Sequence, residues 1–298
     1  MMTSQLDTLT QINLDDLVSA FGWQNIPPLA WLIKRAFLRP ARKFARQMVE
    51  FDELVAKGSL AQASRTIMQK QYVRDVCVHG SEHIPTKGAA LFLSNHPGMA
   101  DTISLFAAIN RTDLKIIALH RPFLEALKNT TTHLFFIDDD PAKRMNAVRG
   151  AANHLRNGGS ALTFPAGEIE PDPLVYPGAL DSLSRWTDSA GVFLRFAPDL
   201  RIVPVVVSGV IWDKAARHPL TRLKRTRAER EKLAAALQLL ALVTRDARPN
   251  TVHVQFAKPI TLEEVGSTAS DAIHAKVIER TRALLGEKIE SRGKSVLW

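Results

Sequence analysis

The 298-residue sequence has little of what would build a disulfide framework or a membrane-spanning helix. Its single cysteine, Cys77, excludes an intramolecular disulfide and a zinc site with several cysteine ligands, and it suits a reducing compartment. The longest uncharged apolar stretch, residues 233–243, is too short to cross a bilayer. The polar, acidic residues 1–16 do not resemble a secretory signal. We therefore expect a cytoplasmic protein whose contact with a membrane is peripheral.

The sequence also lacks the motifs of several common enzyme classes. It has no glycine-rich phosphate loop followed by Lys-Ser/Thr, no Gly-x-Gly-x-x-Gly after a strand, and no Gly-x-Ser-x-Gly nucleophile elbow. The histidines do not cluster as metal ligands, since His79, His83 and His96 fall on separate loop positions. We therefore expect no metal, no cofactor and no serine nucleophile of the hydrolase kind.

Positive charge is in excess. Lysine and arginine number 39 against 30 acidic residues, which gives a formal net charge of +9. Such a balance implies an anionic partner, either a nucleic acid, an anionic membrane surface or a phosphorylated substrate. No nucleic-acid motif and no aromatic stacking platform accompanies the basic residues, so we expect no nucleic acid.

Residues 1–71 are predicted to form a separate helical, basic segment. Residues 29–57 are predicted to be one long helix, or two helices broken near Pro40. Apolar residues at helical spacing alternate with arginines and lysines, and Trp31 lies near the start, which is typical of a helix that anchors in a membrane interface. The alternative is a helix whose apolar face packs on the core while its basic face is solvated.

Residues 72–298 show alternating strands and helices. Strands are predicted over 73–78, 89–93, 114–119, 134–137, 160–164, 201–207 and 251–256, and helices over 142–157, 180–196, 233–243 and 270–290. The alternation predicts one α/β domain with a mostly parallel central sheet flanked by helices. In such sheets the ligand site lies outside the carboxyl ends of the strands.

The most informative stretch is the strand-to-helix turn at residues 94–101. His96 and Asp101 lie five positions apart, and Asp101 is a candidate N-cap of the following helix. An aspartate there could accept a hydrogen bond from one imidazole nitrogen and leave the other as a base. The helix amino terminus would favour a neutral imidazole. The alternative is a structural turn in which Asn95 and His96 satisfy backbone groups and Asp101 only caps the helix.

Three motifs in order give residues 76–260 a resemblance to the glycerolipid acyltransferase family, which includes bacterial 1-acylglycerol-3-phosphate acyltransferases. Residues 95–101 resemble its Asn-His-x-x-x-x-Asp motif, residues 164–168 its Phe-Pro-Glu-Gly motif, and residues 202–206 its Val-Pro-Val block. The spacing and the order of the blocks agree with the family.

The resemblance implies that His96 is a general base oriented by Asp101. A fatty acyl group would pass from an acyl-coenzyme A or an acyl-carrier-protein thioester to a hydroxyl of a lysophospholipid or a related lipid precursor, without an acyl-enzyme. The other motif residues would bind substrate: Asn95, Phe164, Pro165, Gly167 and Glu168. The competing class is a non-catalytic peripheral membrane-binding protein that keeps the fold. The intact His96 and Asp101 argue against it.

Two positions depart from the family pattern. The arginine that usually follows Phe-Ile is replaced by residues 138–140, three aspartates that would repel a phosphate unless Lys143 and Arg144 turn back toward it. Ala166 stands where the family has glutamate, and Glu168 follows two residues later. Arg121 and Arg144 are the remaining candidates for binding an acceptor phosphate. A neutral or amine-containing acceptor stays open.

Overall fold

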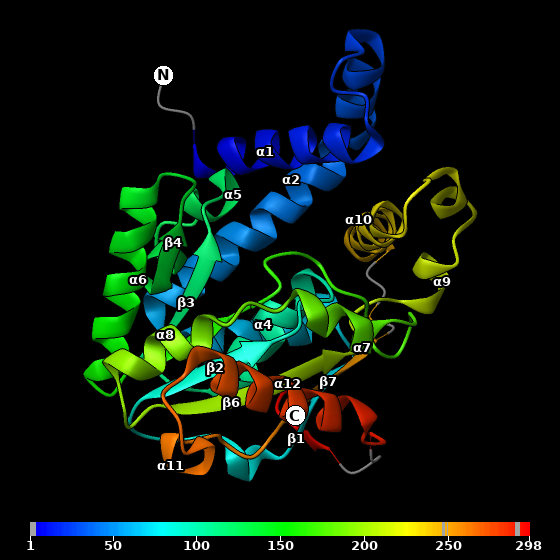
Figure 1. Ribbon diagram of the computed structural model, residues 1–298. Helices are drawn as coiled ribbons and strands as arrows, with labels where there is room; N and C mark the ends of the chain where they lie inside the picture. Colours follow the sequence, from blue (N-terminus) through cyan, green and yellow to red (C-terminus); the bar gives the residue numbers. More distant parts are fainter. Residues whose placement is uncertain (1–3, 246–247, 249, 290–292) are drawn as a thin grey trace.

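The computed structural model describes residues 4–245, 248, 250–289 and 293–298, and in it one eight-stranded sheet organises the chain (Figure 1). The strand order is β4-β3-β5-β2-β6-β7-β1-β8. All neighbours run parallel except β6–β7 and β1–β8. The predicted mostly parallel α/β fold is confirmed. The strands are β1 (Asp75–His79), β2 (Ala90–Ser94), β3 (Leu114–Leu119), β4 (Leu134–Ile137), β5 (Ser160–Thr163), β6 (Arg201–Ser208), β7 (Thr251–Phe256) and β8 (Lys294–Ser295).

Helices cover both faces of the sheet. One core joins the sheet to α2 (Pro27–Lys57), α3 (Leu60–Ile67), α4 (Met99–Ile109) and α10 (Arg227–Arg245). The other joins it to α6 (Pro141–Arg156), α8 (Ser189–Phe196) and α12 (Ser270–Gly286). The remaining α-helices are α1 (Gln5–Phe21), α5 (Pro122–Glu125), α7 (Ala179–Ser182), α9 (Asp213–Ala216) and α11 (Leu262–Val265).

Strand β2 lies in the middle of the sheet, between β5 and β6, and is buried on both sides. Its side chains alternate between the two cores, with Ala90 and Phe92 in the first and Leu91 and Leu93 in the second. A strand buried on both faces needs a continuous apolar run rather than an alternating one. This burial fixes the end of β2, where the candidate site begins.

The amino-terminal helices extend beyond the sheet at one corner of the molecule (Figure 1). Helix α2 continues through Pro40, because its buried face, including Phe44, Met48 and Phe51, packs on the sheet core and offsets the hydrogen bond that proline cannot donate. Helix α1 is held at its start by Ser4, which caps it, and Leu9 on its inner face is fully buried. Among the described residues, no helix is both long and apolar enough to span a membrane.

The single helix predicted over residues 180–196 is wrong. The segment forms α7, the 3-10 helix η4 (Leu183–Arg185) and α8. The break falls at Trp186, which is extended and donates its indole N–H to Glu170, while the Thr187 N–H donates to the Pro165 carbonyl. These long-range hydrogen bonds override the local helical pattern. The helix predicted over residues 270–290 ends at Gly286, and residue 290 lies outside the described residues.

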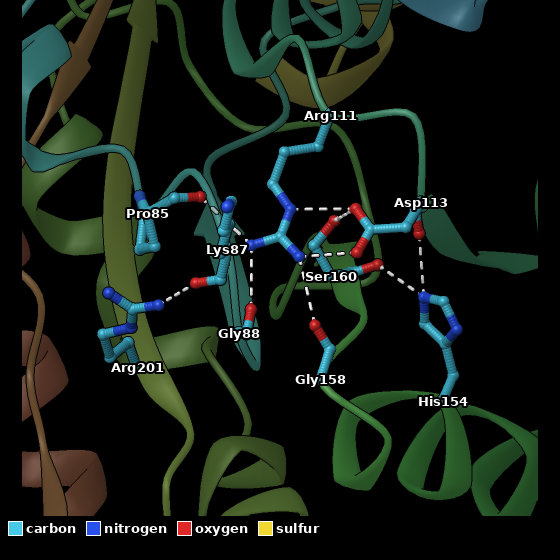
Figure 2. A network of polar contacts seen from close by, with 9 residues as sticks. All are labelled: Pro85, Lys87, Gly88, Arg111, Asp113, His154, Gly158, Ser160 and Arg201. Carbon is cyan, nitrogen blue, oxygen red and sulfur yellow. Dashed lines mark hydrogen bonds and ion pairs between the residues drawn. The ribbon is translucent and has the colours of Figure 1, made fainter.

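A buried arginine ties together the segments that enter three neighbouring strands at their amino ends (Figure 2). The Arg111 guanidinium donates to the carbonyls of Pro85, Gly88 and Gly158, at 2.8 to 3.2 Å. It also forms a two-pronged ion pair with Asp113, at 2.8 and 2.5 Å. Because these residues precede β2, β3 and β5, the cluster sets the starting points of the strands that lead to the site.

Candidate active site

The candidate site begins where β2 ends. Asn95 is buried and exchanges two hydrogen bonds with the backbone of Val207 in β6: its amide donates to the Val207 carbonyl at 2.9 Å, and its carbonyl accepts the Val207 N–H at 2.7 Å. The Asn95 side chain thus holds the turn against the neighbouring strand. The structure gives Asn95 an anchoring position directly before His96.

The structure brings His96 and Asp101 together. Asp101 is fully buried, and its Oδ2 lies 2.8 Å from Nδ1 of His96 and accepts the Gly98 N–H at 2.8 Å. Its Oδ1 accepts the Thr102 hydroxyl at 2.8 Å. The predicted N-cap role of Asp101 is wrong, because α4 begins two residues earlier, at Met99, with Gly98 as its N-cap. From the first turn, the carboxylate reaches back to the turn and to the imidazole.

The other side of the imidazole faces outward. The His96 side chain is 29% exposed, and its ring stacks on Phe164 with centroids 4.4 Å apart. Within the described part of the chain, no hydrogen-bond partner contacts Nε2. Because the Asp101 carboxylate can only accept from Nδ1–H, this tautomer leaves the Nε2 lone pair available to take a proton.

The electrostatics of His96 differ from the expectation of a neutral imidazole held by a helix amino terminus. Burial lowers the pKa of His96, but the charge and hydrogen bond of Asp101, with a further contribution from the charge of Glu170, outweigh burial and raise this pKa above its ordinary value of 6.5. A carboxylate at 2.8 Å outweighs the dipole of a helix end. These two carboxylates therefore stabilise the protonated form of the His96 imidazole.

Sequence reasoning missed Glu170, which contacts the main chain of His96. Glu170 is 1% exposed, and its Oε2 accepts the His96 N–H at 3.1 Å. Its Oε1 accepts from the Trp186 indole at 2.9 Å and from the Ser182 hydroxyl at 2.8 Å. The only sequence signal was a second glutamate shortly after the Phe-Pro motif, and no local pattern separates it from Glu168.

Glu168 itself points to the surface. Its carboxylate is 56% exposed and pairs with Arg185 at 2.6 Å. The turn that separates it from Phe164 needs Gly167, which has φ of +66° and whose N–H donates to the Phe164 carbonyl at 3.0 Å. Pro165 accepts the Thr187 N–H through its carbonyl at 3.1 Å. Of the Phe-Pro motif residues, only Phe164 contacts the His96 ring in the described hydrogen-bond and ring contacts.

Arg121 and Arg144, the two candidates for binding an acceptor phosphate, have different surroundings. Arg144 turns back and donates to the Asp138 carbonyl at 3.2 Å, while Lys143 pairs with the Asp138 carboxylate at 3.6 Å. Arg121 instead lines a pocket of about 160 Å³ at the carboxyl ends of β3 and β4. The other residues of this pocket are Leu119, His120, Ile137, Asp138 and Asp139. This pocket lies on the same edge of the sheet as His96, two to three strands away.

Metal binding has no support in the geometry of the described ranges. They contain no group of three or more histidine, cysteine or acidic side chains that could hold an ion. The arrangement at the carboxyl edge is a histidine, its buried carboxylate partner and the ring of Phe164.

His96 and Asp101 lie within a stretch of the chain that matches a known family. The family model described as Acyltransferase matches residues 75–208. This match confirms the resemblance predicted from the three motifs.

The chain is also similar to the crystal structure of the 1-acyl-sn-glycerophosphate (LPA) acyltransferase PlsC from Thermotoga maritima. The two share 18% sequence identity over 95% of this chain and 97% of that chain, with a TM-score of 0.45. No curated protein matches the chain.

Proposed function

We propose that the protein transfers a fatty acyl group from a thioester, carried by coenzyme A or by acyl-carrier protein, to a hydroxyl of a lysophospholipid or a related lipid precursor. The observation that carries the proposal is the 2.8 Å contact between Nδ1 of His96 and the buried Asp101, which leaves Nε2 facing outward. A base so placed, in an acyltransferase domain, suits direct transfer without a covalent enzyme intermediate.

In this proposal, acyl transfer proceeds in two steps. Nε2 of His96 removes the proton of the acceptor hydroxyl as its oxygen attacks the thioester carbonyl carbon, and a tetrahedral intermediate forms. This intermediate then collapses, the C–S bond breaks, and the imidazolium returns the proton to the departing thiolate. Asp101 remains ionised throughout, fixes the tautomer and stabilises the imidazolium.

We assign the acceptor headgroup to the pocket lined by Arg121. Strands of a sheet are spaced by about 4.8 Å, so this pocket lies roughly 10–14 Å from the end of β2, a span suited to a glycerolipid headgroup whose free hydroxyl reaches His96. Neither arginine has an ion-pair partner among the described residues, but Arg144 donates to the backbone carbonyl of Asp138, whereas Arg121 lines the pocket. Arg121→Ala should therefore raise the acceptor KM more than Arg144→Ala does. Equal effects would contradict this assignment.

The amino-terminal part of α2 supports a further part of the proposal, docking on an anionic membrane. The exposed apolar residues of this region are the N-cap Ile26 and, within the helix, Trp31, Leu32 and Leu38, with exposed fractions of 44%, 63%, 53% and 47%. Arg35 lies between Leu32 and Leu38, and Arg39 follows Leu38. The Arg35 guanidinium lies 5.8 Å from the centre of the Trp31 ring. Exposed aromatic and basic residues together fit the interface of an anionic bilayer.

The docking is tested with vesicles. We expect the protein to sediment with phosphatidylglycerol vesicles, with binding weakened by salt and by the double variant Trp31→Ala, Leu32→Ala. Val192→Ala, Phe196→Ala on α8 is a matched control that also removes two exposed apolar side chains, with exposed fractions of 38% and 53%. Binding that survives the first pair, or that falls equally with both, would contradict the assignment of this surface.

The reaction is tested by thiol release. Long-chain acyl-coenzyme A and acyl-carrier protein are each offered with a panel of lysophospholipid, glycerol phosphate and amine-containing lipid acceptors, with wild type and His96→Ala compared. Acceptor-dependent release that disappears in the variant is the expected result, and the panel identifies the donor and the acceptor. Release that the substitution leaves unchanged, or no release with either donor, would contradict the proposal.

A further inference from the structure

One buried glutamate binds both main-chain polar groups of His96. The Glu170 N–H donates to the His96 carbonyl at 2.9 Å, and Oε2 of Glu170 accepts the His96 N–H at 3.1 Å. Residues 96 and 170 are 74 positions apart in the chain, so this is a tertiary contact between the turn after β2 and the loop after β5. The main chain of the base is therefore held on both sides by a single residue.

The carboxylate of Glu170 is itself fixed by donors from a third segment. Trp186 and Ser182 are 4% and 2% exposed, and they donate to Oε1 at 2.9 and 2.8 Å. Burial raises the pKa of Glu170, while the hydrogen bonds from Trp186, Ser182 and His96 act to lower it. A carboxylate that is buried and bound by three donors has a defined orientation, and it can transmit that orientation to the turn.

Two acidic groups face His96 from two sides of the site. Asp101 comes from α4 and contacts the ring, and Glu170 comes from the loop after β5 and contacts the main chain. The positive charge of Arg185 in η4 acts to lower the pKa of Glu170, and Arg185 also pairs with Glu168. Among the described residues, the charged groups around His96 are therefore linked in the order Asp101, His96, Glu170 and Arg185.

We propose that Glu170 is a positioning residue for the base: it fixes the main chain of His96 and adds negative charge that stabilises the imidazolium. This inference deepens the proposed function and depends on it for the role of His96. Glu170 acts through His96 and touches no substrate in this assignment.

The same loop offers a matched control. Asp172 is fully buried, and it accepts the backbone N–H groups of Leu174, Gly209 and Ile211 at 2.9 to 3.0 Å. Burial raises its pKa as it does for Glu170, but no hydrogen bond joins Asp172 to His96. A variant of Asp172 therefore reports what the loss of a buried carboxylate does to the loop alone.

The test titrates the His96 imidazole by NMR in the free protein, with its resonance assigned from His96→Gln. In Glu170→Gln, the midpoint should move to lower pH, because a negative charge near the imidazolium is removed. The value of kcat at the high-pH plateau should fall about 10-fold or more, since the base is less well placed. In Asp172→Asn, the His96 midpoint should stay at the wild-type value.

An unchanged His96 midpoint and plateau kcat in Glu170→Gln would overturn the proposal, and so would equal shifts in both variants. If Glu170→Gln does not fold, Trp186→Phe removes one donor from the carboxylate and keeps a buried ring. It should lower kcat several-fold without changing the donor KM, and an unchanged kcat would contradict the inference. Because the titration needs no substrate, a failure of the acyl-transfer reaction would leave the test of Glu170 intact.

Discussion

The two ends of the central sheet each carry an aspartate near a histidine, but their surroundings differ: Asp101 is fully buried, whereas the Asp113 side chain is 39% exposed. At the carboxyl end, Asp101 binds the ring of His96, and Nε2 of that ring faces outward. At the amino end, His154 points Nε2 between the carbonyls of Asp113 and Ser160, at 2.8 and 3.1 Å (Figure 2). One histidine has a nitrogen available for chemistry, and the other directs its nitrogen at backbone groups.

The partners of the two aspartates show the same contrast. Burial would raise the pKa of Asp113, but the hydrogen bonds from Arg111 and Ser160 and the charge of Arg111 lower it. Among the described residues, no arginine contacts Asp101; its partner is His96, whose pKa is raised. Arginine thus neutralises Asp113 at the amino end, where we expect the cluster to stabilise the fold. At the carboxyl end the charge of Asp101 acts on a histidine, which is the arrangement that the proposed proton transfer requires.

The largest effect should separate the two histidines. His96→Gln should lower kcat by about 10³-fold, the contribution expected of a general base. His154→Gln should leave kcat of the folded enzyme within about 2-fold, since the hydrogen bonds of His154 to the described residues all go to backbone carbonyls. Steady-state rates of both variants with the same donor and acceptor measure the difference. Comparable losses in the two would remove the functional distinction between the ends of the sheet.

The next largest effect should fall on stability at the amino end. Arg111 is nearly buried, so Arg111→Ala leaves Asp113 and three carbonyls without their donor and should lower the free energy of unfolding by about 3 kcal/mol. The exposed Arg185, which pairs with Glu168, is the control. Removing its charge should cost under about 1 kcal/mol. Urea unfolding curves of Arg111→Ala and Arg185→Ala measure both, and equal midpoints would contradict this account.

A smaller effect should appear with pH. The raised pKa of His96 means that acyl transfer, which needs the neutral imidazole, should increase as pH rises above 6.5 through the folded-state pKa. The same shift stabilises the fold fully below the unfolded value of 6.5, and this contribution is lost as pH rises through the folded pKa. Rate and this part of the stability should therefore change in opposite directions. A rate that is flat with pH above 6.5, measured with pH-independent substrates, would contradict the raised pKa.

The smallest effect should come from Ser160, whose fully buried hydroxyl donates to Asp113 at 2.9 Å. Ser160→Ala removes one hydrogen bond and should lower the free energy of unfolding by about 1 kcal/mol. Its kcat should equal that of wild type. A loss of rate without a loss of stability would place Ser160 in the catalytic machinery instead.

Local patterns in the sequence were sufficient for most of the strands. The predicted bounds of β3, β4 and β7 coincide with those observed, because short apolar runs between turn residues leave little choice of length. The strand order, with antiparallel β6 and β7, depends on contacts between distant segments and has no local signal. The same holds for the break at Trp186, which is caused by its hydrogen bond to Glu170.

The candidate site likewise contains residues that the sequence could predict and one that it could not. His96 and Asp101 could be found because one turn holds both, and five positions suffice to bring their side chains within 2.8 Å. Glu170 could not be distinguished from Glu168, since only the turn at Gly167 and the distant Trp186 and Ser182 decide which glutamate is buried. The contribution of Asp101 to the pKa of His96 likewise exceeds what a helix end alone would suggest.

The most direct test compares Asp101→Asn with Asp113→Asn, the same substitution at the two ends of the sheet. We expect Asp101→Asn to lower kcat by about 10²-fold or more, because the imidazole loses its positioning partner and its stabilising charge. Asp113→Asn should lower the unfolding midpoint and leave kcat of the folded enzyme near that of wild type. An Asp101→Asn enzyme with wild-type kcat, or an equal loss of kcat in both, would contradict the assignment of catalysis to the carboxyl end.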